Sequence, residues 1–205
     1  MARLCVATNN IGKQREFVQL LAGWGGDIVF PGDLGIDLEV DESGASFEEN
    51  AILKARAYAA ASGLPGLADD SGLEVDALGG APGILSARYA GAGASDQDRR
   101  QKLLTALAAT PIDRRSARFR CVVAISDPGG RVAVAAGTCE GRIALEPRGT
   151  HGFGYDPVFY LPEYGCTMAE LRPELKNQIS HRARAIQAAR PLLDALLMSS
   201  DFLAE

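Results

Sequence analysis

The sequence predicts an α/β fold built on a mixed β-sheet. Its first third alternates short apolar runs with an amphipathic helical segment, which is the βαβ order of a parallel sheet. Further along, two long apolar runs flank a turn sequence, as in an antiparallel hairpin. A sheet with both arrangements is mixed, and no segment of the 205 residues reads as a linker between independent domains. We therefore expect residues 1–205 to form one domain.

The opening segment predicts a strand, a helix and a second strand. Residues 3–8 (RLCVAT) have the length and apolar character of a buried strand. In residues 13–23, apolar side chains recur on one helical face and a glycine stands at the end. Residues 27–33 (DIVFPGD) form a short apolar run closed by a Pro-Gly pair, which indicates the next strand and its turn.

The clearest local pattern is a capped helix over residues 47–61. Ser46 and Glu49 have capping-box spacing, in which each side chain satisfies a free backbone N–H at the helix start. Gly63 suits the C-terminal end. The small and aromatic residues of one face are expected to point inward: Ala51, Ala55, Tyr58 and Ala59.

The middle of the chain alternates irregular and regular segments. Residues 64–75 (LPGLADDSGLEV) are interpreted as a short strand that ends at two acids and a Ser-Gly turn. Residues 79–91 are rich in glycine and proline and predict a loop. Ser95 and Asp98 predict the capped start of a helix that reaches about residue 109.

The second half of the chain predicts a hairpin and a final helix. Residues 119–126 and 131–141 flank Asp-Pro-Gly-Gly, a strong turn sequence. The last helix opens at Ser180, and Pro191 lies too far inside it to be a first-turn proline, so we expect a kink or a break there.

Composition excludes several classes of protein. A formal net charge of −5 argues against a sequence-independent grip on nucleic acid, which depends on clustered Lys and Arg. The four cysteines have no zinc-site spacing and are expected to be reduced. No apolar run approaches the ~18 residues of a membrane span, and the N-terminus does not resemble a secretory signal. We expect a soluble cytoplasmic protein, and its charge is compatible with a small anionic ligand, because a local pocket can oppose the overall sign.

The first candidate for chemistry is the turn Thr8-Asn9-Asn10-Ile11-Gly12-Lys13, between a predicted strand and a predicted helix. Backbone N–H groups at a helix start and a lysine ammonium suit a phosphate chain. The turn lacks the GxxxxGK[ST] spacing of a Walker A loop. An ordinary capped turn with a surface lysine would use the same residues, so that alternative stays open.

The second candidate is the acidic group Asp69-Asp70-Ser71-Gly72, expected at a strand end. Neighbouring carboxylates can hold Mg²⁺, which prefers oxygen ligands, and one of them can orient or deprotonate a water molecule. Acids also populate exposed turns, so a structural role remains open. Asp41-Glu42 could complete the metal site if the two segments meet, or could lie in a solvated loop.

Two further candidates lie in the second half. In Phe153-Gly154-Tyr155-Asp156-Pro157, an aromatic ring can stack on a base and a carboxylate can read a ring N–H. Aromatic side chains near glycine also pack plain cores. Lys176 with Ser180-His181-Arg182 could bind a base oxygen or a phosphate, or form a solvated basic turn. His151 has no evident metal partner and is interpreted as a loop residue.

Taken together, these residues resemble the inosine/xanthosine triphosphate pyrophosphatase family, the Ham1/RdgB-like house-cleaning enzymes. The matching stretches follow the family order over nearly the whole chain: ATNNIGKQREF, SFEENAILKARAYA, LADDSGLEVDALGGAPGILSARYAG, FGYDPVF and KNQISHRARA. The resemblance implies a long mixed sheet bent between two lobes with flanking helices, an active site in the cleft, and a homodimer.

The resemblance also implies an activity, a cofactor and a set of site residues. The expected reaction is the Mg²⁺-dependent hydrolysis of ITP, dITP and XTP to the monophosphate and pyrophosphate. Asp70 is the expected general base, and the metal ligands are Glu42, Asp70 and Asp69, with Asp41 an alternative to Glu42. The substrate-binding set comprises Thr8, Asn9, Asn10, Ile11, Gly12, Lys13, Lys54, Ser71, Phe153, Gly154, Tyr155, Asp156, Lys176, His181 and Arg182.

Two departures and two alternatives accompany the resemblance. Asn9 stands where a common form of the family pattern has glycine, and Asp41-Glu42 leaves the acidic register open by one residue. A Maf-like nucleotide pyrophosphatase would share the chemistry, but the FGYDP and SHR stretches argue against it. A nucleotide-binding module without hydrolysis would not need the paired acids.

Overall fold

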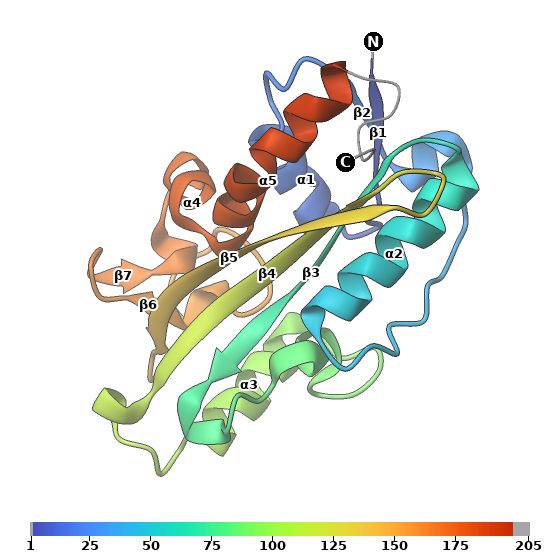
Figure 1. Cartoon of the computed structure of the whole chain (residues 1–205). Helices are drawn as coiled ribbons and strands as arrows, with labels where there is room; N and C mark the ends of the chain where they lie inside the picture. The colour runs from blue at the N-terminus through green and yellow to red at the C-terminus, as the bar shows by residue number, and fades with distance from the viewer. Residues whose placement is uncertain (1, 199–205) are drawn as a thin grey trace. The chain divides into compact units, whose positions relative to one another are not determined.

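The computed structural model describes residues 2–198 and is an α/β fold with a mixed sheet, as the sequence predicts (Figure 1). Seven strands lie in the order β2-β1-β3-β4-β5-β6-β7. β1 pairs in parallel with β2 and β3, whereas β6 pairs antiparallel with β5 and β7. The strands are β1 Arg3–Val6, β2 Asp27–Val29, β3 Gly66–Val75, β4 Ser116–Ser126, β5 Val132–Ile143, β6 Phe159–Leu161 and β7 Cys166–Thr167. The α-helices are α1 Ile11–Leu20, α2 Phe47–Ser62, α3 Asp96–Ala106, α4 Pro173–Ile179 and α5 His181–Met198.

The chain divides into two compact units, each with its own apolar core. Among the described residues, the first unit comprises 2–70, 121–137 and 182–198, and the second comprises Ser71–Arg120 and Thr138–His181. The long strands β3, β4 and β5 each contribute residues to both units.

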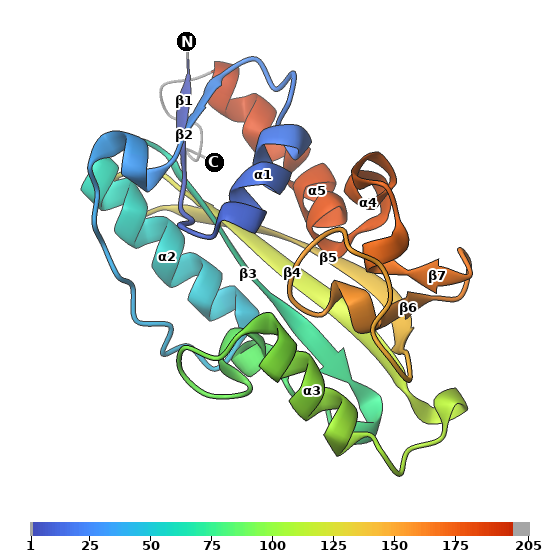
Figure 2. The same cartoon turned by 180° about the vertical axis from the view of Figure 1, so that it is seen from behind.

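In the first unit, helices cover both faces of the strands. Leu4 and Val6 of β1 join one core with Phe17 of α1 and Leu193 of α5. Cys5, which lies between them in the strand, points to the opposite face, on the side of Ser62 of α2. Figures 1 and 2 both show α1 beside α5 and α2 apart from them. The alternation of side chains along the strands therefore separates an α1/α5 face from an α2 face.

In the second unit, α3 packs on the parts of β3 and β4 that belong to this unit (Figure 2). Leu103 and Leu107 belong to a core that includes Leu73 of β3, Phe119 of β4 and Phe159 of β6. Ser95 caps α3 by accepting a hydrogen bond from the Asp98 N–H, as its sequence pattern predicts. The predicted start of this helix is confirmed, and the regular helix ends at Ala106.

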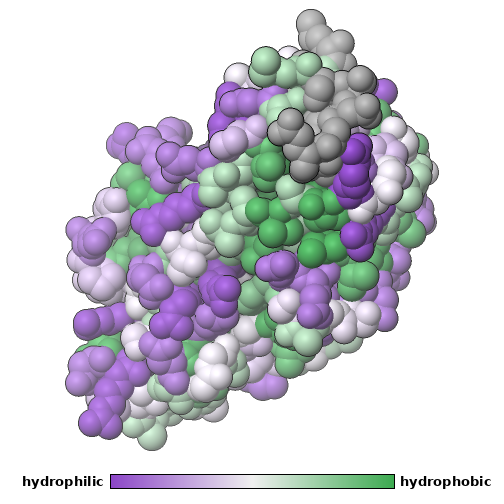
Figure 3. Space-filling model, in the orientation of Figure 1, coloured by the Kyte–Doolittle hydropathy of each residue, from purple (hydrophilic) through white to green (hydrophobic). Residues whose placement is uncertain are grey.

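Figure 3 shows the hydropathy of the residues on one face of the molecule. Hydrophilic residues are spread widely over this face, and hydrophobic residues gather over β5, where Val134 is 40% exposed. No helix within residues 2–198 is both long and apolar enough to cross a bilayer.

Two local expectations need correction. The strand predicted to stop at the acidic pair instead continues as β3 from Gly66 to Val75, so Asp69 and Asp70 lie in mid-strand. Of the kink or break expected at Pro191, the break is absent, because α5 runs as one helix from His181 to Met198. Ala189 and Leu193 on either side of this proline are buried in the core, which offsets the hydrogen bond that proline cannot make. The hairpin is confirmed as β4 and β5, and the Asp127 N–H donates to the Arg131 carbonyl at 3.0 Å to close its turn.

Candidate functional site

The turn between β1 and α1 is held by its own polar side chains. Asn10 is the N-cap of α1 and accepts a hydrogen bond from the Lys13 N–H at 3.0 Å. Thr8 Oγ1 accepts from the Asn10 N–H at 3.2 Å, and the Thr8 carbonyl accepts from Gln14 at 3.0 Å. Asn9 and Ile11 are exposed. The first N–H groups of a helix have no intrahelical acceptor, so this ordered turn can offer them to an anion.

Lys13 is tied to a buried carboxylate. Its Nζ lies 3.0 Å from Asp69 Oδ1, and the Lys13 side chain keeps 18% of its surface exposed while that of Asp69 keeps 1%. The other Asp69 oxygen accepts from Nε and Nη2 of Arg182, at 3.2 and 2.8 Å. Arg182 also forms a short ion pair with Glu16 of α1. A buried chain of alternating charges therefore runs from Glu16 through Arg182 and Asp69 to Lys13.

The ionisation of Asp69 follows from these partners. Burial alone would raise the pKa of Asp69, but the positive charges of Arg182, Lys13 and Lys54 outweigh burial and hold that pKa well below its usual range. The Arg182 pKa is raised, since Asp69 and Glu16 outweigh a burial that would lower it. Asp69 therefore stays charged, with both of its oxygens bound to cations.

Asp70 faces the opposite side of β3, because neighbouring residues of a strand alternate. Its Oδ2 accepts from the Asn50 side chain at 3.1 Å, and its Oδ1 lies 3.4 Å from Lys54 Nζ. Lys54 Nζ also lies 2.9 Å from Glu42 Oε1. The structure thus brings Asp70, Lys54 and Glu42 together on the α2 face and leaves Asp69 on the other face.

Burial and the nearby Glu42 raise the pKa of Asp70, against the opposing charge of Lys54. Burial would lower the pKa of Lys54, but Asp70, Asp69 and Glu42 raise it overall. Within residues 2–198, no group of three or more His, Cys, Asp and Glu residues is arranged to hold a metal ion. Two carboxylates do suit Mg²⁺, which commonly takes one or two protein carboxylates and fills its remaining positions with water and substrate phosphates.

Asn50 also belongs to this candidate site, although its sequence position did not indicate it. It is fully buried, and its side-chain oxygen accepts from the Gly44 N–H at 2.8 Å, which turns its amide N–H groups toward Asp70. A Cβ at Gly44 would lie 2.6 Å from that oxygen, so the backbone approaches too closely for a larger residue. The available sequence clue was the spacing of Asn50 and Lys54, four residues apart on one helix face.

The second unit brings together Phe153, Asp156 and Lys176. Asp156 Oδ2 lies 2.6 Å from Lys176 Nζ and accepts from the Phe153 N–H at 2.9 Å. The same ammonium lies 5.0 Å from the centroid of the Phe153 ring. Gly152 has φ +76°, and a Cβ there would lie 2.0 Å from Asp156 Oδ2. The loop therefore presents an aromatic ring next to a lysine whose position is set by a buried carboxylate.

Tyr155 and His181 contact other residues of the second unit, whereas Ser71 and His151 keep exposed surface. Tyr155 is buried in the second core and donates through its hydroxyl to the Ser86 carbonyl at 2.9 Å. His181 stacks on Phe119 with ring centroids 4.7 Å apart. Ser71 is half-buried in β3. His151 is exposed in its loop, as expected.

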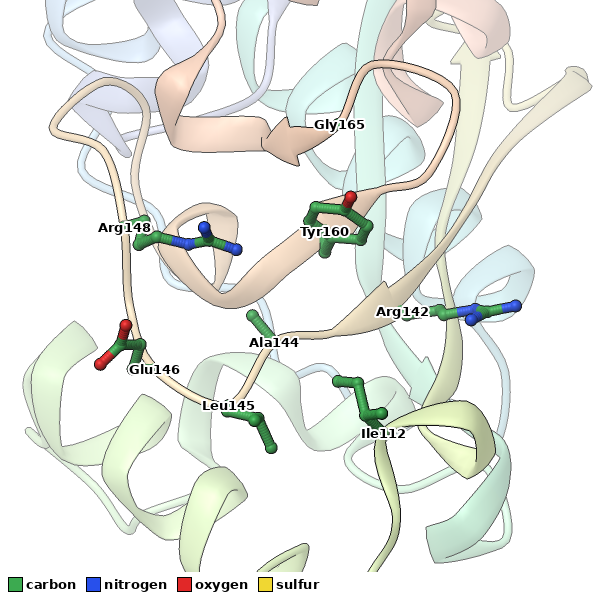
Figure 4. A pocket seen from close by; sticks show the side chains of 8 residues that line it. All are labelled: Ile112, Arg142, Ala144, Leu145, Glu146, Arg148, Tyr160 and Gly165. Atoms are coloured by element: carbon green, nitrogen blue, oxygen red, sulfur yellow. The ribbon is translucent and has the colours of Figure 1, made fainter.

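A separate pocket of about 400 Å³ lies in the second unit (Figure 4). The Arg148 side chain extends toward the Tyr160 ring (Figure 4), and its guanidinium carbon lies 6.0 Å from the ring centroid. Its lining contains none of the predicted site residues: Ile112, Arg142, Ala144, Leu145, Glu146, Arg148, Tyr160 and Gly165.

Comparison with known proteins shows likeness over most of the chain. A model of the Ham1 family matches residues 4–192. A dITP/XTP pyrophosphatase of Desulforamulus reducens is 50% identical over 199 residues, which cover 97% of this chain and 99% of the relative. A protein of the same name from Geobacillus kaustophilus is 53% identical over 186 residues, 91% of each chain. The solved structure of a HAM1 protein from Coxiella burnetii matches with a TM-score of 0.85 and 44% identity, covering 94% of this chain and 98% of that one.

Proposed function

The chain belongs to the Ham1 family, and from that premise we propose that it hydrolyses non-canonical purine nucleoside triphosphates, such as dITP, XTP and ITP, to the monophosphate and pyrophosphate. The named relatives support this substrate class. The observation that carries the proposal is the position of Asp70, which contacts Asn50 and a lysine that also contacts Glu42. This arrangement supplies a base, a cation and a second acid in one place.

Glu42 and Asp70 would hold a magnesium ion in this proposal. Their contacts to the same ammonium put both carboxylates within reach of one small cation. When bound, Mg²⁺ supplies positive charge to the phosphate oxygens. Asp69 has a different role, because both of its oxygens bind cations on the other face of β3.

The phosphate chain is assigned to residues 8–13 and Lys54. The N-terminal N–H groups of α1 and the partly exposed Lys13 ammonium supply donors and positive charge. Asp69 holds that ammonium, and Arg182 holds Asp69. We therefore assign Arg182, which the resemblance places in the substrate-binding set, to positioning of the phosphate-binding lysine.

Asp70 is assigned as the base that orients and deprotonates the attacking water at the α-phosphorus. A pKa raised by burial and Glu42 makes its carboxylate a better proton acceptor than an ordinary aspartate. Asn50 donates to one oxygen and fixes its orientation. No covalent intermediate is required.

Recognition of the base is assigned to Phe153 and Lys176 of the second unit. The Phe153 ring can stack on a purine, and the Lys176 ammonium, held by Asp156, can donate to the carbonyl at the six-position. Adenine presents an amino group there, so two donors would face each other and stay unpaired. The preference for inosine and xanthosine over adenosine follows from this geometry.

The family match also bears on one alternative function, whereas the assembly and the cellular location are separate predictions. The family match favours this function over a Maf-like pyrophosphatase. A homodimer in the cytoplasm, with no nucleic acid or membrane partner, remains a prediction.

The test is a product assay with purified protein and dITP, XTP or dATP, with and without Mg²⁺. We expect pyrophosphate rather than orthophosphate from dITP and XTP, little turnover of dATP, and loss of turnover when a chelator removes the metal. Asp70→Asn should lower kcat by about 10² to 10⁴ with KM nearly unchanged, which is the range for loss of a general base. Orthophosphate as the product, or near wild-type kcat in the variant, would overturn the proposal.

A further inference from the structure

Both polar groups of the Gly154 backbone are bound by side chains of α3. The Gly154 N–H donates to Asp96 Oδ2 at 2.8 Å, and the Gly154 carbonyl accepts from Arg100 Nη1 at 2.7 Å. Asp96 and Arg100 are four residues apart, so they lie on the same face of the helix. Gly154, expected from the sequence to bind substrate, uses its N–H and carbonyl inside the protein.

Asp96 is itself firmly placed. It stands in the first turn of α3, where a carboxylate is favoured by the helix dipole, and it forms a short ion pair with Arg99. Arg99 is anchored in turn by donating to the carbonyls of Ala87 and Ala94, at 2.7 and 2.8 Å. Burial would raise the pKa of Asp96, but hydrogen bonds from Arg99 and the Gly154 N–H outweigh burial and lower it. The carboxylate is therefore charged at neutral pH.

The Arg100 side chain that binds Gly154 leaves one of its buried nitrogens without a hydrogen bond in the described residues. Its Nε is buried and has no hydrogen-bond partner in the described part of the chain. A buried donor without a partner is uncommon in native proteins and requires an explanation. Holding the Gly154 carbonyl in a defined place is such an explanation.

The position of Gly154 matters because of its neighbours. It has φ +61°, a left-handed backbone conformation, and it links Phe153 to the segment that ends at Asp156. The Lys176 ammonium contacts both the ring of Phe153 and the carboxylate of Asp156, as described above. A shift of the Gly154 peptide groups would therefore move the ring and the carboxylate that set the place of the lysine.

We propose that Asp96 and Arg100 are positioning residues for purine selection, which hold the 153–156 loop so that Phe153 and Lys176 meet the base. This inference rests on the proposed function. It places a determinant of selectivity on α3, outside the residues that touch the base, and it predicts that the two side chains act as one unit.

The test compares Asp96→Ala, Arg100→Met and the double variant with two matched controls. Asp98→Ala removes a carboxylate from the same helical turn, and Lys102→Met removes a cation one half-turn away. Loss of a charged hydrogen bond predicts a roughly 10- to 100-fold lower kcat/KM for dITP, expressed mainly in KM, with a loss of about tenfold in the preference for dITP over dATP. The double variant should lose about as much as the worse single variant, because both side chains hold one residue. Arg100→Lys should recover part of the loss.

A second measurement separates positioning from misfolding. Inhibition by inorganic tripolyphosphate reports the phosphate site without a base, and its inhibition constant should stay within about twofold of wild type, because loss of Asp96 or Arg100 leaves those contacts intact. Unchanged selectivity in folded variants, or equal losses in the Asp98 and Lys102 controls, would overturn the inference. Absence of pyrophosphate release by the wild-type protein would instead overturn the proposed function.

Discussion

Replacing Arg182 with methionine removes the guanidinium that joins two acids in the first unit. Arg182 is 1% exposed, and its fork binds Asp69 Oδ2 through two nitrogens while a third pairs with Glu16. Methionine retains an apolar stem of similar length and can pack near Phe17. The change therefore removes charge and hydrogen bonds with little change in volume.

The expected cost follows from the burial of the two acids. Breaking a buried pair by removing one partner typically costs about 3–5 kcal/mol, because the remaining charge is left in the interior. Because Lys13 still neutralises part of the Asp69 charge, we expect Arg182→Met to lower the free energy of unfolding by about 3 kcal/mol, near the lower end of this range. This is a large fraction of the ~5–15 kcal/mol by which domains are usually stable.

The cost should also depend on pH. In the wild-type protein the pKa of Asp69 is depressed, so its contribution is present above the unfolded pKa and is lost as pH falls through the folded pKa. Without Arg182, burial favours the protonated acid, and a group with a raised folded pKa loses stability as pH rises. The difference between variant and wild type should therefore be larger at pH 7 than at pH 4.

Urea unfolding followed by fluorescence of Trp24 would measure this cost. Trp24 is the only tryptophan, is 2% exposed, and donates to the Leu193 carbonyl of α5 at 2.8 Å. Arg190→Met is the matched control, since that arginine lies on the same helix in an exposed pair with Asp194 and should contribute less than about 1 kcal/mol. A loss in Arg182→Met no greater than in the control, or independent of pH, would refute the reasoning.

The other predictions concern the two candidate sites. Lys54→Met removes a charge that lowers the pKa of Asp70, so a pH profile of kcat/KM at fixed Mg²⁺ should show the acidic limb at higher pH than in the wild-type protein; an unmoved limb would contradict Asp70 as the base. Gly152→Ala should raise KM for dITP about tenfold or more, because the new Cβ would lie 2.0 Å from Asp156 Oδ2. Gly165→Ala, which has a similar positive φ and open space around it, should show only the backbone strain in a thermal melt, and equal KM values for the two variants would contradict the steric argument.

The sequence predicted best those features that depend on neighbouring residues. The helix caps at Ser46 and Ser95 and the hairpin turn after Ser126 each follow from side chains a few positions apart, and each is confirmed. The mixed sheet follows from the order of such elements. Local chemistry was sufficient because the deciding hydrogen bonds are local.

The errors have a common cause in distant contacts. A strand was expected to end at Asp69 and Asp70 because these two acids are followed by a Ser-Gly turn. The partners of Asp69 and Asp70 are Arg182 and Lys54, which the sequence places 113 and 16 residues away. Asn50 was missed for the same reason, since its importance appears only when β3 lies beside α2.

The alternation of Asp69 and Asp70 along β3 gives two tasks to adjacent peptide units. One acid anchors a network that contributes to folding, and the other is assigned to the reaction itself. Because Asp69 and Asp70 both lie in β3, a mutation in α1 or α5 that changes the contacts of Asp69 would also shift the backbone that carries Asp70. A substitution of Glu16 that raises the free energy of unfolding is therefore expected to change the turnover number as well.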